Sequence, residues 1–349
     1  MILNLSTITK SLVAGLSLLC AFGVSATEAD SASHADVWKY IPTFHGTLRA
    51  FYQQSTTTGD GRFIIRNARL SAGGFVLPRV DYFMQVDFCD RGKIKLLDVF
   101  MRATPATGLQ VYLGQMRVPF SVESSRVPHL YYFADVGLVA LYGNLRSVGV
   151  KAGYQVSKTP LYIEAGVFNS TDMADHTRWN SAFTYAVKAN YKFDYLTPEI
   201  AFMSRVPGGK GAGCRINQLD AALQWRCGEL YVEGEYIYRH YCGPMKNSQA
   251  FSIFADYGWP VKWRWANRVS VQSRFEGVTA GSSGQYVDGV LPQDIAARRR
   301  LTVGATTSLS YQKLHFDFKV NYEQYFYGHD PEGSADDNSK LVAGAVLYF

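Results

Sequence analysis

The chain has 349 residues and a formal net charge of +6, which is too small to indicate a nucleic-acid partner. Hydrophobic residues make up 47% of the chain, aromatic residues 14% and charged residues 18%, a composition that excludes a disordered chain. No uninterrupted apolar run reaches the roughly 18 residues of a membrane-spanning helix, so such a helix is excluded as well.

The first 26 residues are predicted to be a secretory signal peptide. Lys10 precedes an apolar stretch at residues 12–24, and residues 24–26 place small side chains where a signal peptidase cleaves. A short polar lead follows at residues 27–40.

From residue 44 onward, apolar and polar residues alternate within segments of about ten residues, which is typical of β-strands with one apolar face. In residues 298–310, for example, Leu301 and Val303 share one face, and Arg300 and Thr302 share the other. The alternation predicts sixteen strands at residues 44–54, 62–73, 79–88, 94–103, 109–115, 146–156, 161–168, 182–193, 199–205, 215–226, 230–240, 249–257, 264–275, 298–310, 313–327 and 339–349.

The connections between these strands alternate in length. Those after even-numbered strands are tight, as at residues 77–78 and 311–312, whereas those after odd-numbered strands are mostly longer and polar, as at residues 116–145 and 277–297. A soluble sandwich has no reason to separate loop lengths in this way, but outer-membrane barrels do. We therefore predict an all-β fold: a closed, antiparallel transmembrane β-barrel at residues 41–349.

An even strand number places both ends of the barrel, and the lead at residues 27–40, on the short-turn periplasmic side. The chain ends at Phe349 with Leu347 on the same face of the last strand, an ending typical of outer-membrane barrels. We expect a location in the bacterial outer membrane, with outer-membrane lipid around the barrel and an aqueous lumen inside it.

Two segments resemble the phosphate-selective porin O and P family. They are Phe63 to Leu70 (FIIRNARL) and Val111 to Glu123 (VYLGQMRVPFSVE), and Asp98 lies between them where that family tends to carry an acid. The resemblance implies a homotrimeric sixteen-stranded porin whose third long loop folds into the lumen and whose basic residues attract small anions or phosphate.

The first of these segments departs from the family at one position. Arg66 and Arg69 match its motif, and Arg117 occupies the basic place before the Pro-Phe pair of the second segment. The family commonly shows two adjacent arginines where this chain has Arg66 and Asn67. The loss of one cation leaves a general anion preference.

We predict that basic side chains line the lumen, because a cation in a narrow channel lowers the barrier to an anion. Arg66 and Arg117 are the main candidates, since motif and position agree. The alternative for each arginine is a cross-strand ion pair that only makes the wall rigid. The predicted lining and anion-binding residues are Arg66, Arg117, Arg69, Arg126, Arg49, Arg264, Arg268, Arg300 and Asp98.

Residues 116–145 form a connection far longer than usual, which indicates a functional role. The segment contains an apolar and aromatic cluster at residues 130–133 and several charged residues. It can fold inward and narrow the pore, or it can shield the barrel mouth as a surface loop. We favour the constriction.

Four cysteines follow the signal peptide, and an oxidising envelope permits disulfides among them. The hairpin of the tenth and eleventh strands brings Cys214 and Cys242 to the same rim. Either a bridge or two free thiols fits the sequence, which does not give the Cα separation.

No phosphate-binding loop, GxSxG, CxxC or HExxH motif occurs, so we expect no enzyme activity, no cofactor and no metal site. We predict a diffusion porin for small hydrophilic solutes with a mild preference for anions, phosphate included. Two alternatives stay open: a non-conducting adhesin or scaffold barrel, and a hydrolase whose catalytic residues converge at the rim.

Overall fold

The fold is that of a computed structural model. The predicted signal peptide and nearly all of the predicted lead lie outside the described residues and stay predictions. A compact unit extends from Pro42 to Phe349. The structure describes residues 40–90, 92–171, 173, 179, 181–209, 211–243, 245–328 and 338–349.

Sixteen antiparallel strands make up this unit, in the places where the alternation predicts them. Most of their ends lie within two residues of the predicted ends. The strands are β1 (Thr43–Ser55), β2 (Gly61–Leu77), β3 (Val80–Asp90), β4 (Lys93–Ala106), β5 (Leu109–Arg117), β6 (Arg146–Gln155), β7 (Leu161–Asn169), β8 (Phe183–Tyr191), β9 (Leu196–Arg205), β10 (Ile216–Cys227), β11 (Leu230–Tyr241), β12 (Ser248–Trp263), β13 (Ala266–Val278), β14 (Arg298–Tyr311), β15 (Leu314–Tyr327) and β16 (Lys340–Tyr348).

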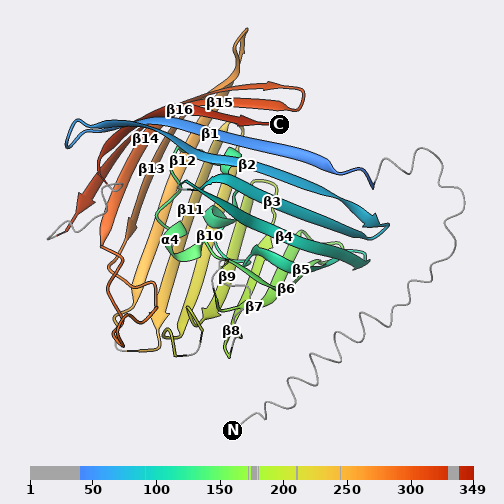
Figure 1. Ribbon diagram of the computed structural model, residues 1–349. Coiled ribbons are helices and arrows are strands. Elements are labelled where there is room, and N and C mark those ends of the chain that lie inside the picture. The colour runs from blue at the N-terminus through green and yellow to red at the C-terminus, as the bar shows by residue number, and fades with distance from the viewer. Residues whose placement is uncertain are drawn as a thin grey trace, which may run out of the picture. The chain divides into compact units, whose positions relative to one another are not determined.

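The sheet closes on itself because β1 pairs with both β2 and β16 (Figure 1). The β1 and β16 pairing runs from Thr47 opposite Tyr348 to Ser55 opposite Lys340. Closure leaves no strand edge with unpaired backbone groups, and this is the condition for a sheet to cross a bilayer. The predicted closed sixteen-stranded barrel is confirmed.

The clearest error of the sequence analysis is at the turn between β12 and β13. Gly258 and Pro260 favour a turn, but β12 continues to Trp263 and the turn consists of Arg264 and Trp265. A register irregularity after Pro260 accommodates this residue, which lacks a backbone donor, inside the strand. Arg264 therefore belongs to an exposed turn and not to β13.

The two faces of the strands differ in the way the alternation predicts. On β14, Arg300 and Thr302 point inward and are buried, whereas Leu301 and Val303 point outward and are exposed. Apolar side chains thus cover the outside of the barrel, where lipid surrounds it, and polar side chains cover the inside.

Cys214 and Cys242 are both free. The backbone N–H of Cys242 donates to the carbonyl of Arg215, so the residue opposite Cys214 is Gly243. The two cysteines are offset by one position and point to opposite faces of the sheet. A bridge between them is therefore disfavoured.

The segment between β5 and β6, residues 118–145, carries three short helices: α3 (Val122–Ser125), η2 (Pro128–Leu130) and α4 (Ala140–Gly143). We call it the interior segment, because α4 and its neighbours lie within the ring of strands in Figure 1. Within the described residues, no helix is long and apolar enough to cross a membrane.

Candidate functional site

The interior segment reaches the wall of the barrel opposite its own ends. Its backbone N–H groups donate to the side chains of Glu235 on β11, Glu276 on β13 and Asn321 on β15. The donor to acceptor distances are 3.0, 2.5 and 2.7 Å. Since the segment begins at β5 and ends at β6, these bonds place it across the lumen.

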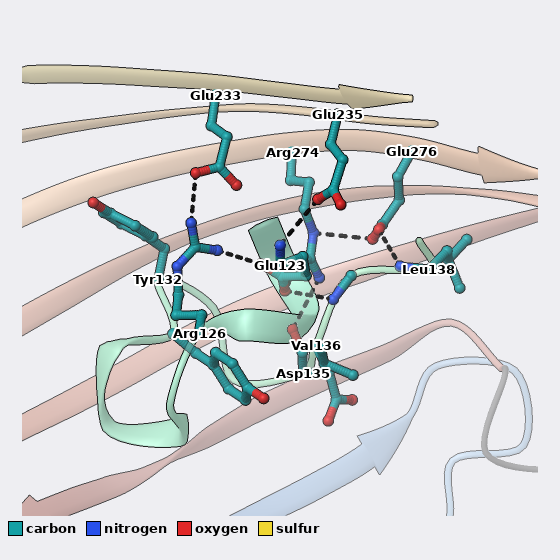
Figure 2. Close-up of polar contacts among 12 residues, drawn as sticks. Glu123, Arg126, Tyr132, Asp135, Val136, Leu138, Glu233, Glu235, Arg274 and Glu276 are labelled. Carbon is teal, nitrogen blue, oxygen red and sulfur yellow. Dashed lines mark hydrogen bonds and ion pairs between the residues drawn. The ribbon is translucent and has the colours of Figure 1, made fainter. Parts of the chain in front are cut away.

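Buried ion pairs join the segment to the same wall (Figure 2). Arg126 contacts both Glu123, one helical turn before it, and Glu233 on β11, whose Oε2 lies 2.5 Å from Arg126 Nη2. Arg274 on β13 lies 3.7 Å from Glu123 and 2.9 Å from Glu276. Burial alone would raise the pKa of Glu123, but Arg126 and Arg274 outweigh it and lower this pKa. Glu123 is therefore ionised and bound to the wall.

Apolar contacts reinforce these bonds. Phe120, Leu138 and Tyr142 of the segment belong to one buried cluster with Met203 on β9 and Ile237 on β11. A segment with its own packed core holds a fixed position better than one held by surface ion pairs alone.

Arginines of the N-terminal strands face the other side of the interior segment. A small cavity of about 110 Å³ lies there, lined by Arg49 on β1, Arg66 and Arg69 on β2, and by Tyr131 and Asn144 of the segment, among others. None of its lining residues bears a carboxylate. Its three arginines make this cavity basic.

Two larger cavities adjoin the small one. A cavity of about 390 Å³ reaches residues of the long loops, such as Thr171 and Gln285, and shares Arg69 and Asn144 with the small cavity. A cavity of about 740 Å³ extends to the short-turn rim and shares Tyr131 with it. The small cavity therefore adjoins both of the larger ones.

Arg49 and Arg117 have no carboxylate partner among the described residues. Arg49 is buried and donates to Asn67 at 2.9 Å and to the carbonyl of Ala134. Arg117 donates to the carbonyl of Arg126 at 3.1 Å. Of the two, Arg49 lines the small cavity, whereas Arg117 lines none of the three cavities.

Arg66 and Arg69 form ion pairs. Arg66 is 3.2 Å from Asp135 of the interior segment, and its side chain is 40% exposed. Arg69 is 2.8 Å from Asp87 on β3. The position where the family has a second arginine is Asn67, whose amide nitrogen donates to the same Asp87.

The remaining predicted residues lie elsewhere in the barrel. Arg126 and Arg300 hold the interior segment. Arg268 lines the 740 Å³ cavity and pairs with Asp256 at 2.5 Å. Asp98 pairs with Arg146 at 3.0 Å. Arg264 lies in the exposed turn described above. The structure thus brings Arg49, Arg66 and Arg69 together and disperses the others. Sequence reasoning missed Glu235 and Glu276 as anchors of the interior segment.

His129 docks η2, which we call the tip of the interior segment, beside the last strand, β16. Its ring stacks on Tyr348 with centroids 3.8 Å apart, and Nδ1 lies 3.5 Å from the hydroxyl of Thr47. Burial, with a smaller effect of His315, lowers the pKa of His129 from 6.5 to about 4. His129 binds a proton more weakly when it is docked against Tyr348 than when it is exposed to water. The contribution of His129 to docking is therefore complete above pH 6.5 and is lost as the pH falls towards 4.

We expect the open-channel current noise of the wild type to increase between pH 6.5 and pH 4, because protonation of His129 loosens the tip. A His129→Phe variant keeps a stacking ring but does not titrate, so its noise should stay constant over this range. Single-channel recording over a pH series makes the comparison. An equal increase in both proteins would assign the effect to other groups.

The model of the family described as phosphate-selective porin O and P matches residues 43–198, from β1 into β9. The predicted family resemblance is confirmed over this range. The fold is that of a porin-type barrel, and the expected location in the bacterial outer membrane is confirmed. No curated protein sequence matches the chain.

Solved structures share the fold of this porin barrel at low sequence identity. An anion-selective porin from Comamonas acidovorans has a TM-score of 0.61 at 11% identity, over 88% of this chain and 99% of that one. The Pseudomonas putida protein OprB at high pH has a TM-score of 0.61 at 10% identity, over 90% and 96%. OmpT of Vibrio cholerae in its trimer form has a TM-score of 0.57 at 11% identity, over 88% and 98%.

Proposed function

We propose that the protein is a diffusion porin that admits small hydrophilic solutes and prefers anions, inorganic phosphate among them. The observation that carries this proposal is the 110 Å³ cavity, which three arginines line without any carboxylate and which adjoins two larger cavities. We place the ion-selective part of the water-filled path at this cavity, because charges that line a narrow passage decide which ions pass.

The distribution of charge around the interior segment supports the anion preference. The acids Glu123, Glu235 and Glu276 are engaged on the β11 and β13 side of the segment, where they accept bonds from its backbone or from arginines. Arg49 and Arg66 face the opposite side. Because water screens charges poorly in a narrow protein-walled passage, this asymmetry favours anions there.

A planar bilayer experiment tests the proposal. In a potassium chloride gradient, the refolded protein is expected to give discrete conductance steps and a reversal potential directed towards the chloride equilibrium potential. A reversal potential directed towards potassium would contradict the anion preference. Absence of steps would contradict the porin function and favour the adhesin or scaffold alternative.

We also propose that the barrel assembles as a homotrimer, for which the trimer form of the similar Vibrio cholerae OmpT is the support. Unheated detergent extracts should then migrate at about three times the mass of the heated chain, which is 38.9 kDa before removal of the predicted signal peptide. Crosslinking before electrophoresis measures the same state, and a product limited to dimers would contradict the proposal.

A further inference from the structure

The carboxylate of Asp135, in the interior segment, lies between cations from two different strands. Oδ1 is 3.2 Å from Nη2 of Arg66 on β2, and Oδ2 is 3.0 Å from Nζ of Lys340 on β16. The carboxylate side chain is only 7% exposed. Burial alone would raise the pKa of Asp135, but Lys340, Arg66 and Arg300 hold it well below its usual range. Asp135 thus carries a full negative charge beside Arg66.

The backbone around Asp135 is held without this carboxylate. Arg274 donates to the carbonyl of Asp135 at 3.0 Å, and Arg300 donates to the carbonyl of Val136 at 2.6 Å. The N–H of the preceding residue donates to Asn321 at 2.7 Å. Figure 2 shows Asp135 and Val136 at this contact, next to Arg274. Loss of the side-chain charge therefore leaves the segment anchored.

Arg66 is shared between Asp135 and the 110 Å³ cavity. Of the three arginines that line this cavity, Arg49 is buried and Arg69 is 12% exposed, whereas Arg66 is 40% exposed. An anion that enters the cavity therefore finds its most accessible guanidinium already paired on one side with a fixed carboxylate.

We propose that Asp135 is a tethered competitor for the permeating anion at Arg66. The inference rests on the proposed anion porin and names the residue that sets its affinity. When a free anion binds Arg66 from the cavity, Asp135 keeps its pair with Lys340, and when the anion leaves, Asp135 neutralises Arg66 again. Competition of this kind keeps binding weak enough for release, which conduction requires.

The test compares the wild type with Asp135→Asn, which keeps the shape of the side chain and removes its charge. Inorganic phosphate is added as a blocker of chloride current in planar bilayers. The variant should need about threefold less phosphate for half-block, since a partly exposed ion pair is being removed, and its anion over cation permeability ratio should rise. The matched control is Asp81→Asn, a buried acid that pairs with Arg102 at 2.9 Å and lines none of the three cavities; it should change neither value.

A second pair of variants isolates the competition. In an Arg66→Gln background, the further change Asp135→Asn should no longer lower the half-blocking phosphate concentration, because the shared partner is gone. An unchanged half-blocking phosphate concentration in the single Asp135→Asn variant would overturn the inference. A higher conductance with a lower anion preference would also overturn it, because it would show that the carboxylate only holds the segment in place. The wild-type reversal potential tests the porin proposal separately from these differences between variants.

Discussion

Replacement of Glu276 by alanine is expected to raise the single-channel conductance severalfold. Glu276 is fully buried, pairs with Arg274 at 2.9 Å and with Arg300 at 2.6 Å, and accepts the backbone N–H of Leu138 at 2.5 Å. Removal of one partner of a buried pair costs about 3–5 kcal/mol, because the remaining charges stay buried without compensation. The same substitution releases the interior segment from β13, so the segment should leave the lumen more often and widen the path.

A matched acid provides the control for this prediction. Glu164 on β7 is also buried and inward-facing, and it pairs with Lys151 at 2.8 Å and with Lys188 at 3.7 Å. None of its described polar contacts involves the interior segment. Glu164→Ala should therefore leave the conductance near the wild-type value. Equal conductance changes in the two variants would show that the loss of any buried wall acid, and not release of the segment, controls the pore.

The barrel could be predicted from the sequence because its signals are local. A period of two within each strand reports which side chains face lipid, and the lengths of the connections report which rim they belong to. The error at β12 arises because the local signal misleads. Pro260 favours a turn, but the irregular pairing with β13 accommodates it within the strand.

The anchors of the interior segment could not be predicted in this way. Glu164 and Glu276 both follow the inward parity of their strands, yet only Glu276 meets the segment. That difference depends on the path of residues 118–145 through the lumen, which long-range packing decides. Cys214 and Cys242 show the same limit, since an offset of one residue between two strands decides whether their side chains meet.

The departure from the family motif at Asn67 has a structural explanation that the sequence alone does not provide. The side-chain oxygen of Asn67 accepts from Arg49 at 2.9 Å, and its nitrogen donates to Asp87 at 2.7 Å. The amide thus links a cation on one neighbouring strand to an acid on the other. A positive charge is absent at this position, but Arg49 is held in place beside the cavity and supplies one from β1.

Simultaneous replacement of Arg66 and Arg117 by glutamine is expected to abolish the anion preference and to weaken phosphate block of chloride current about tenfold. Arg66 is the most exposed arginine of the 110 Å³ cavity, and Arg117 has no carboxylate partner among the described residues. The double variant removes one cation from the cavity and a second one from β5, within electrostatic range of Arg69 and Tyr131 of the cavity lining. A tenfold change corresponds to only about 1.4 kcal/mol. Reversal potentials and half-blocking phosphate concentrations measure the effect.

Arg102→Gln is the control for charge loss away from the 110 Å³ cavity. Arg102 pairs with Asp81 at 2.9 Å, is 36% exposed and lines none of the three cavities. Its removal should leave both measurements near the wild type. If Arg102→Gln lowered the anion preference as much as the double variant, selectivity would follow from the total charge of the inner wall. If only the double variant lost it, selectivity would reside in the cations at the 110 Å³ cavity and beside it.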